Sequence, residues 1–166
     1  MILAFDSYYF DNKAKTVCVQ FENWTDSAPS QVYSEVLENI AEYEPGAFYK
    51  RELPCILSLL KQIPLDSCIA IVVDGFVFLD DEAKPGLGAR LYESLEGAIP
   101  VIGVAKTNFA TLQREKISVL RGESEKPLFI TAIGFNPEEA ATKIASMQGE
   151  YRIPSLLKLL DSMTKE

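Results

Sequence analysis

The stretch that decides the fold of this 166-residue chain is Cys68-Ile69-Ala70-Ile71-Val72-Val73-Asp74-Gly75. Residues 68–73 form an unbroken apolar run rich in β-branched side chains, which is typical of a strand covered on both faces. An acid and a glycine end the run, and the carboxyl ends of such strands are where α/β proteins place their sites. The stretch therefore predicts a buried strand with a functional carboxylate at its end.

The segments on either side alternate between strand and helix patterns. They predict strands over 2–10, 16–21, 99–106 and 128–133, and helices between 48 and 64 and over 87–95, 137–147 and 154–163. Because a helix separates the strands at 68–73 and 99–106, these two strands are expected to be parallel. Residues 32–40 fit either a helix or a strand. With 48% hydrophobic residues and no repeat or linker, the chain is expected to form a single α/β domain over 1–166.

The composition limits the chemistry that the chain can perform. It contains no histidine, which excludes Ser-His and Cys-His nucleophilic schemes. Its three cysteines lack C-x-x-C spacing, so we expect buried thiols rather than disulfides or a zinc site. No signal peptide or bilayer-spanning run is visible, which predicts a soluble, cytoplasmic protein. Any hydrolysis would depend on water activated by a metal.

The charge of the chain bears on its partners. A formal net charge of −8 and a pI near 4.7 argue against a generic nucleic-acid binder, whose affinity comes largely from neutralising phosphates. Acids that hold a metal add to the net negative charge, however, and a basic strip on one part of the surface is compatible with a protein that is acidic overall. The candidate residues for such a strip are Lys50, Arg51, Lys106, Arg114, Lys116, Arg121 and Lys126.

Three carboxylates stand where an apolar element would otherwise continue. Asp6 interrupts the first strand, Glu52 lies near the start of the helix that follows Phe48, and Asp74 ends the buried strand. Bringing such acids together costs free energy unless a cation neutralises them, and a hard divalent ion with oxygen ligands is the usual partner. The three acids therefore predict a Mg²⁺ site. Taken singly, each also fits an ordinary solvated strand-end, helix-start or turn acid.

Several short motifs resemble, in the same order, those of the endonuclease V family. They are Y-E-P-G-A-F-Y-K-R-E at 43–52, V-D-G at 73–75, G-L-G-A at 86–89, I-P-V-I-G-V-A-K at 99–106, K-P-L-F-I at 126–130 and Y-R-I-P at 151–154. The likeness covers roughly residues 1 to 160. It implies an RNase H-like mixed sheet with helices on both faces. It also implies Mg²⁺-dependent cutting of DNA or RNA beside inosine, as in DNA repair, with Mn²⁺ as the other metal to consider.

The resemblance assigns roles to individual residues. Asp6 and Asp74 would be direct metal ligands, Glu52 would hold the metal through water, and Lys106 would stabilise the phosphate or the attacking water. For the substrate, Tyr43 and Pro45 match parts of the wedge that separates the strands, and Gly46 and Gly75 match the backbone walls of the pocket for the displaced base. Other tyrosines, Tyr8 among them, are more often strand or core residues than base-stacking ones.

The chain departs from the family in its histidines. The first family histidine falls in Leu79-Asp80-Asp81-Glu82 and the second at Phe135, and the second glycine of V-D-G-x-G is Val77. In the family, the first histidine shapes the base pocket and the second supports the metal site. Asp80 or Glu82 is a candidate substitute, although a solvated acidic loop is the simpler interpretation. Three functions therefore stay open: an inosine endonuclease, a metal-dependent nuclease with another substrate, and a catalytically silent nucleic-acid-binding or protein-interaction module.

Overall fold

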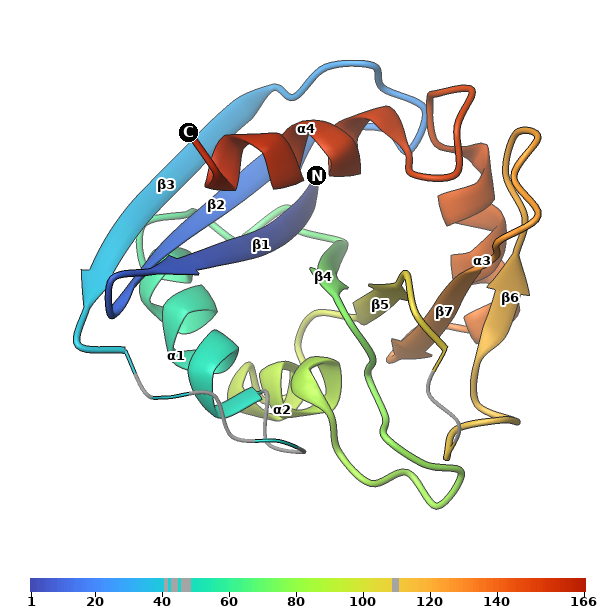
Figure 1. Cartoon of the computed structure of the whole chain (residues 1–166), viewed down its shortest axis with the longest axis horizontal. Helices are drawn as coiled ribbons and strands as arrows, with labels where there is room; N and C mark the ends of the chain where they lie inside the picture. The colour runs from blue at the N-terminus through green and yellow to red at the C-terminus, as the bar shows by residue number, and fades with distance from the viewer. Residues whose placement is uncertain (41, 43–44, 46–48, 109–110) are drawn as a thin grey trace.

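The computed structural model describes residues 1–40, 42, 45, 49–108 and 111–166 (Figure 1). Within these residues a seven-stranded sheet has the order β3-β2-β1-β4-β5-β7-β6. The strands are β1 (Ile2–Phe10), β2 (Lys13–Phe21), β3 (Gln31–Glu38), β4 (Ala70–Asp74), β5 (Val101–Ala105), β6 (Ile117–Val119) and β7 (Leu128–Ile133). The helices are α1 (Tyr49–Leu60), α2 (Leu87–Ser94), α3 (Pro137–Ser146) and α4 (Ser155–Thr164).

The sheet is mixed, as the sequence predicts. β1, β2 and β3 form an antiparallel meander, and the positive φ angles of Asp11 (45°) and Asn12 (63°) make the tight turn between β1 and β2. The strand at the deciding stretch, β4, lies parallel to both β1 and β5. The predicted parallel pair of β4 and β5 is thereby confirmed. β7 then runs antiparallel to β5 and carries β6 at the edge.

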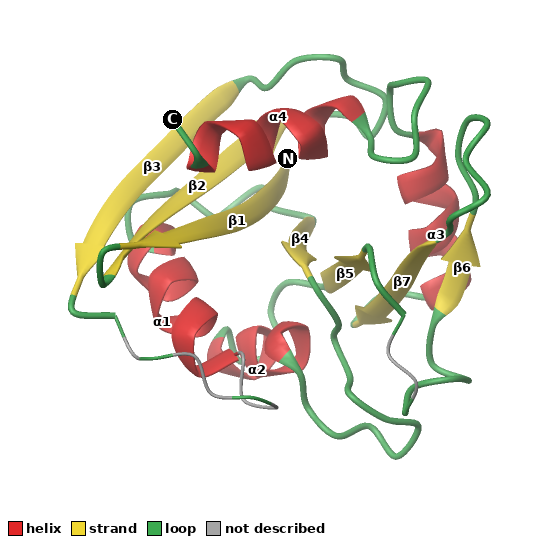
Figure 2. Ribbon diagram, viewed as in Figure 1, coloured by secondary structure: helices red, strands yellow, loops and turns green. Residues whose placement is uncertain are grey.

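Two helices cover each face of the sheet, also as predicted. On one face α3 packs against β6 and β7, and α4 lies along β1 and β2 (Figure 2). On the other face α1 and α2 pack against each other and against the strands. Each face buries its own apolar cluster, one around Ile2, Ile102 and Leu156, the other around Phe5, Ile71 and Leu59. Burial on both sides explains why β4 and β5 are almost wholly apolar.

The structure settles the segment that the sequence left open. Residues 31–38 form the edge strand β3. Its exposed and half-buried residues alternate because β3 pairs with a strand on one side only and turns one of its two faces to solvent. The short strand β6 was not predicted, since three residues give too little pattern. Asn136 caps α3 as expected, and its side chain accepts hydrogen bonds from the amides of Glu138 and Glu139.

The composition predicts buried thiols, and two of the three cysteines are buried. All three cysteines are free thiols; Cys18 and Cys55 are buried, as expected, but Cys68 is partly exposed. Among the described residues, no helix is long and apolar enough to cross a membrane.

Candidate active site

Asp6 and Asp74 lie on neighbouring parallel strands. Phe5 of β1 pairs with Val73 of β4, so the acids that follow them are at the same level of the sheet. Asp6 is 7% exposed, and its Oδ1 accepts a hydrogen bond of 2.9 Å from the amide of Ser7. Asp74 is the last residue of β4 and is open to solvent. Strand β1 continues beyond this point while β4 ends, which leaves both carboxylates at the place where the two strands part.

Glu52 belongs to α1, which packs on the other face of the sheet. It lies in the first turn of that helix and is only 5% exposed. Tyr9 of β1 interacts with its carboxyl group, and the guanidinium of Arg51 lies 3.6 Å from the centre of the Tyr9 ring. The electrostatic influence of both Asp6 and Asp74 extends to Glu52. The three predicted acids are thus brought into one electrostatic cluster.

The pKa values of these acids reflect their crowding. Burial, and then the negative charge of Asp74, raises the pKa of Asp6 to about 7. Burial raises the pKa of Glu52 to about 8, the interaction with Tyr9 acts in the other direction, and Asp6 and Asp74 add to the rise. One side of Asp74 is enclosed by protein, and this desolvation raises its pKa although Lys106 acts in the other direction. The cluster therefore holds negative charge that the protein compensates only in part.

A fourth acid, Asp161 of α4, joins the cluster and was missed in the sequence. Its carboxylate interacts directly with Asp6, and both of its oxygens accept hydrogen bonds from Lys165, at 3.1 and 3.2 Å. Burial acts to raise the pKa of Asp161, but the hydrogen bond from Lys165 and the charge of Lys106 outweigh it and hold this pKa below its usual range. The available signal was an acid one turn after Leu157, on the helix face whose apolar residues pack on the sheet.

Lys106 follows β5 and faces the same cluster. Its charge acts on Asp6, Asp74 and Asp161. Its backbone is held from behind, because the guanidinium of Arg152 donates a hydrogen bond to the carbonyl of Lys106 and another, of 2.9 Å, to the carbonyl of Pro127. Lys106 therefore has a fixed backbone and a side chain placed among carboxylates.

Arg121 is not part of a basic surface strip, contrary to the expectation from the sequence. It is 5% exposed, and its guanidinium donates to four carbonyl oxygens of the loop before α4. These belong to Met147, Gly149, Tyr151 and Arg152, at 2.5 to 3.2 Å. Arg121 is a structural residue that shapes the loop carrying Arg152, and so it supports Lys106 indirectly.

A small cavity lies behind the acids. It has a volume of about 30 Å³, enough for about one or two water molecules. Asp6, Asp74 and Lys106 form its polar side, and apolar residues of β1, β4, β5 and α4 form the remainder, including Leu157 and Leu160. The apolar wall lowers the local dielectric constant, which strengthens every charge interaction at the cluster.

The donor set suits Mg²⁺ or Mn²⁺. All four acids offer carboxylate oxygens, which hard divalent ions prefer, and the raised pKa values of Asp6, Glu52 and Asp74 mark charge that a cation would offset. As the side chains stand, however, no group of three acid, cysteine or histidine residues in the described part of the chain is arranged to hold an ion. The acids influence one another electrostatically, but no three of the described side chains are positioned to bind the same ion.

The predicted substrate residues have mixed outcomes. Tyr43 and Gly46 lie outside the described residues, and Pro45 is an exposed turn residue. Gly75 has a φ of +123°, with no atom within 4 Å of where a Cβ would be. There is thus open space directly beside Asp74.

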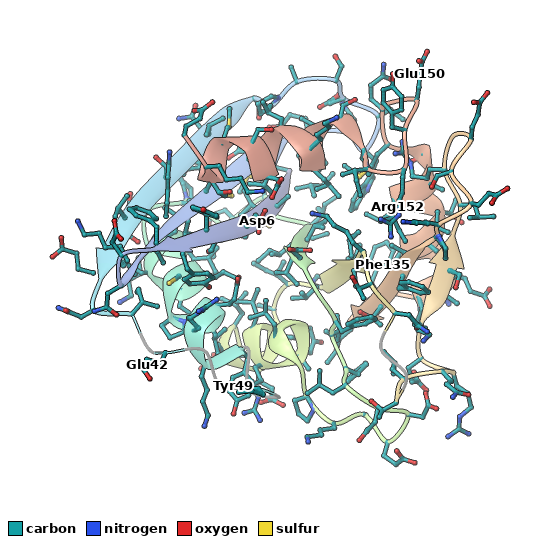
Figure 3. All side chains as sticks on the ribbon, viewed as in Figure 1. Asp6, Glu42, Tyr49, Phe135, Glu150 and Arg152 are labelled. Atoms are coloured by element: carbon teal, nitrogen blue, oxygen red, sulfur yellow. The ribbon has the colours of Figure 1, made fainter. Side chains whose placement is uncertain are left out.

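The positions of the family histidines lie away from the cluster. Phe135 packs on the apolar core under α3 and α4, apart from Asp6 (Figure 3). Asp80 caps its own loop by accepting hydrogen bonds from the amides of Glu82 and Lys84, both 3.0 Å. The acid that reaches the cluster is Asp161, and the loop at 80–82 has a local structural role.

Searches against known proteins agree with this geometry at the level of the fold. No protein-family model and no curated protein matches the sequence. Endonuclease V from Streptomyces avermitilis matches with a TM-score of 0.75 at 22% identity, over 99% of this chain and 79% of that one. Endonuclease V from Ciona intestinalis, solved with DNA containing an inosine followed by a ribo-adenosine, matches with a TM-score of 0.80 at 15% identity, over 99% and 84%.

A more distant match shows how general the architecture is. Argonaute from Marinitoga piezophila, solved with guide RNA and target DNA, gives a TM-score of 0.55 at 10% identity, over 99% of this chain and 29% of that one. The predicted RNase H-like sheet is therefore confirmed. The chain has the fold of endonuclease V over nearly its whole length, at a sequence identity of 22% and 15% to the two endonuclease V proteins named above.

Proposed function

We propose that this protein is a divergent, metal-dependent endonuclease that hydrolyses a phosphodiester bond of DNA or RNA near a deaminated base, inosine. The observation that supports this most is that Asp6, Asp74 and Lys106 line one cavity where β1 and β4 part, with Glu52 within electrostatic reach of both acids, in the fold of endonuclease V. A relative with this fold has been solved with inosine-containing DNA. The nucleic-acid partner of this chain is part of the proposal.

The residues divide the chemistry among them. Asp6 and Asp74 would hold Mg²⁺ directly, Glu52 would hold it through water, and Asp161 adds a fourth carboxylate beside Asp6. When bound, the ion supplies a Lewis acid and water of lowered pKa. Lys106 places an ammonium group beside the scissile phosphate, where it stabilises the negative charge that develops in the transition state. The apolar wall behind the acids keeps bulk water from screening these charges.

Recognition of the base is assigned to the segment around the wedge and to the end of β4. Tyr43 and Pro45 would separate the strands, and Gly46 and Gly75 would line the pocket for the displaced base. Gly75 suits this role because the space beside its Cα is open. A side chain there would meet a base placed next to Asp74, and its positive φ disfavours any residue other than glycine.

The proposal is tested with the isosteric variant Asp74→Asn. Wild-type protein and variant are incubated with inosine-containing and unmodified DNA and RNA, single-stranded and duplex, in Mg²⁺ or Mn²⁺. We expect cutting near inosine in the wild type and a loss of at least about 100-fold in the variant, because a ligand and its charge are removed. Asp80→Asn, which changes an acid of the 80–82 loop, is the matched control and keeps activity. Equal cutting by wild type and Asp74→Asn would refute the proposal.

A catalytically silent nucleic-acid-binding protein is the second candidate. Two observations favour it: the chain has no histidine, and the described acids are not arranged as a three-ligand group. It predicts binding of inosine-containing strands, measured by fluorescence anisotropy, with no cutting in either metal. The same incubation therefore separates the two functions.

A further inference from the structure

The outer half of β1 exposes an aromatic pair beside the acid cluster. Side chains alternate along a strand, so Asp6, Tyr8 and Phe10 lie on the same face of the sheet. Tyr8 is 43% exposed and Phe10 is 38% exposed. Their rings are stacked, with centroids 6.2 Å apart and an interplanar angle of 21°. The pair therefore presents aromatic surface to solvent within two to four residues of Asp6.

Among the residues that the structure describes, no helix covers this surface. Helix α4 packs on β1 and β2 and covers the inner half of the face, where Ile2 and Ala4 are fully buried. The ammonium of Lys15 donates a hydrogen bond of 3.2 Å to the carbonyl of Glu166, just beyond the end of α4. Lys15 is paired with Tyr8 across the β1–β2 ladder. Helix α4 therefore covers the face only as far as Tyr8. Exposed apolar side chains that lie together mark interaction sites.

Positive charges surround the aromatic pair. Lys15 is the cross-strand partner of Tyr8, and Lys13 is the cross-strand partner of Phe10. Lys165, which bridges to Asp161, also lies close enough to Tyr8 for the two groups to interact electrostatically. Two of these lysines form ion pairs: Lys13 lies 3.5 Å from a carboxylate oxygen of Glu38, and Lys165 lies 3.1 Å from one of Asp161. Both pairs are partly exposed to solvent, where ion pairs are weak and readily exchange partners.

We propose that Tyr8 and Phe10, with Lys13, Lys15 and Lys165, form a platform on which the single-stranded flank of the nucleic-acid substrate stacks. This inference rests on the proposed function, because the strand is the one cut at the acid cluster. Two residues of a β-strand advance about 7 Å, so a phosphate beside Asp6 leaves the neighbouring bases within reach of both rings. Bases stack on aromatic side chains regardless of sequence, and the lysines accommodate the phosphates between them.

The test compares binding of the full chain to fluorescein-labelled, unmodified single-stranded DNA and RNA by anisotropy, in EDTA so that no metal-dependent cutting occurs. The double variant Tyr8→Ala, Phe10→Ala is expected to bind about 10-fold more weakly, the loss typical of removed base stacking. Tyr8→Phe keeps the stack and is expected to bind as the wild type does. Tyr151→Ala removes a tyrosine that is also exposed but lies in the loop before α4, and it serves as the matched control.

A second variant probes the charges independently of the rings. Lys13→Gln together with Lys15→Gln is expected to reduce the dependence of log Kd on log salt concentration by about 1.4, since each phosphate contact with a single strand contributes about 0.7. If the wild type binds or cuts nucleic acid and neither set of changes alters binding, the platform is refuted while the proposed function stands. If the wild type neither binds nor cuts, both fail. If the aromatic variant only abolishes self-association in sedimentation, the face is an interface between copies of this chain and the inference is wrong.

Discussion

Burial gives Asp6 and Glu52 properties that an exposed acid does not have. Both side chains are more than nine-tenths buried and share a neighbour of like charge, Asp74. Their charged forms are therefore disfavoured in the folded protein relative to the unfolded chain. A divalent cation would reverse this balance, so the acids that weaken the metal-free fold at neutral pH are the ones that a metal would use.

The stability of the metal-free protein is expected to depend on pH through Asp6. Its pKa rises from 3.8 to about 7 on folding, so its contribution is complete below pH 3.8 and is lost as the pH rises through 7. The substitution Asp6→Asn removes the ionisable group and with it this loss of stability at high pH. In urea unfolding with EDTA, the free energy of unfolding of the variant relative to the wild type is expected to be higher at pH 8 than at pH 5.5 by about 1–2 kcal/mol. An unchanged difference at the two pH values would contradict the buried position of Asp6.

Arg152 positions Lys106 through its backbone, and this defines a second prediction. Both hydrogen bonds come from Nη2 of Arg152, which the rigid guanidinium plane holds between the carbonyls of Lys106 and Pro127, whereas the ammonium of a lysine sits on a flexible stem without such a plane. We expect Arg152→Lys to lower kcat about 10-fold with little change in KM, because substrate binding is kept while the transition-state contact is displaced. Arg114→Lys, at an exposed ion pair with Asp81, is the control and keeps kcat. A changed KM with unchanged kcat would assign Arg152 to binding instead.

At the scale of elements, the site depends on the close contact between β5 and the segment that follows the end of β4. A Cβ on Gly103 of β5 would lie 2.5 Å from the carbonyl oxygen of Gly75 and 2.7 Å from Oγ1 of Thr131. That same Oγ1 accepts a hydrogen bond of 2.8 Å from the amide of Val77. The segment that follows Asp74 is thus pressed against β5, and a glycine is what permits the contact.

Gly103→Ala is therefore expected to be destabilising and to impair the site at the same time. The added methyl group must push residues 75–77 away from β5, at a cost of about 1–3 kcal/mol in the free energy of unfolding. Chemical denaturation measures this change, with Ser118→Ala on exposed β6 expected to stay within about 0.5 kcal/mol of the wild type. Wild-type stability in Gly103→Ala would mean that the contact is looser than the structure indicates.

Most elements were predictable because each has a local signal of its own. The unbroken apolar run identified β4, the apolar spacing between Phe48 and Pro64 identified α1, and Asn136 identified the start of α3. The pairing of β7 with β5 and the edge position of β3 depend on contacts far apart in the sequence, which a pattern within one segment does not contain.

At the scale of the whole molecule, the candidate site combines residues of five segments that are far apart in the sequence: β1, α1, β4, the end of β5 and α4. The sequence made Asp6, Glu52 and Asp74 candidates because each stands where an apolar element would otherwise continue. Glu52, Asp74 and Lys106 also fall in the quoted motifs. Asp161 was missed, since it becomes part of the site only when α4 lies across β1, and no motif marked it. Arg121 was wrongly assigned to a basic surface strip because charged residues are usually exposed. Its guanidinium instead donates hydrogen bonds to carbonyl oxygens of the loop before α4.

The four acids together predict stabilisation by metal. An ion that binds only the folded state at 100 times its Kd adds about 2.7 kcal/mol, which corresponds to a rise in Tm of about 5–10 °C for a chain of this size. We expect this rise with Mn²⁺ in the wild type and its loss in Asp74→Asn, with Asp80→Asn responding as the wild type does. Equal rises in all three proteins would show that the ion binds elsewhere.

The position of α4 across the first hairpin has a consequence for how the protein is made. During synthesis β1 and β2 emerge well before α4 and can pair at once, but the cavity beside Asp6 closes only when residues 155–164 dock on them. Asp6 and Asp161, which repel each other, are therefore brought together in a late folding step that depends on contacts of large sequence separation. A nascent chain therefore lacks the assembled acid cluster until α4 has left the ribosome and docked on β1 and β2.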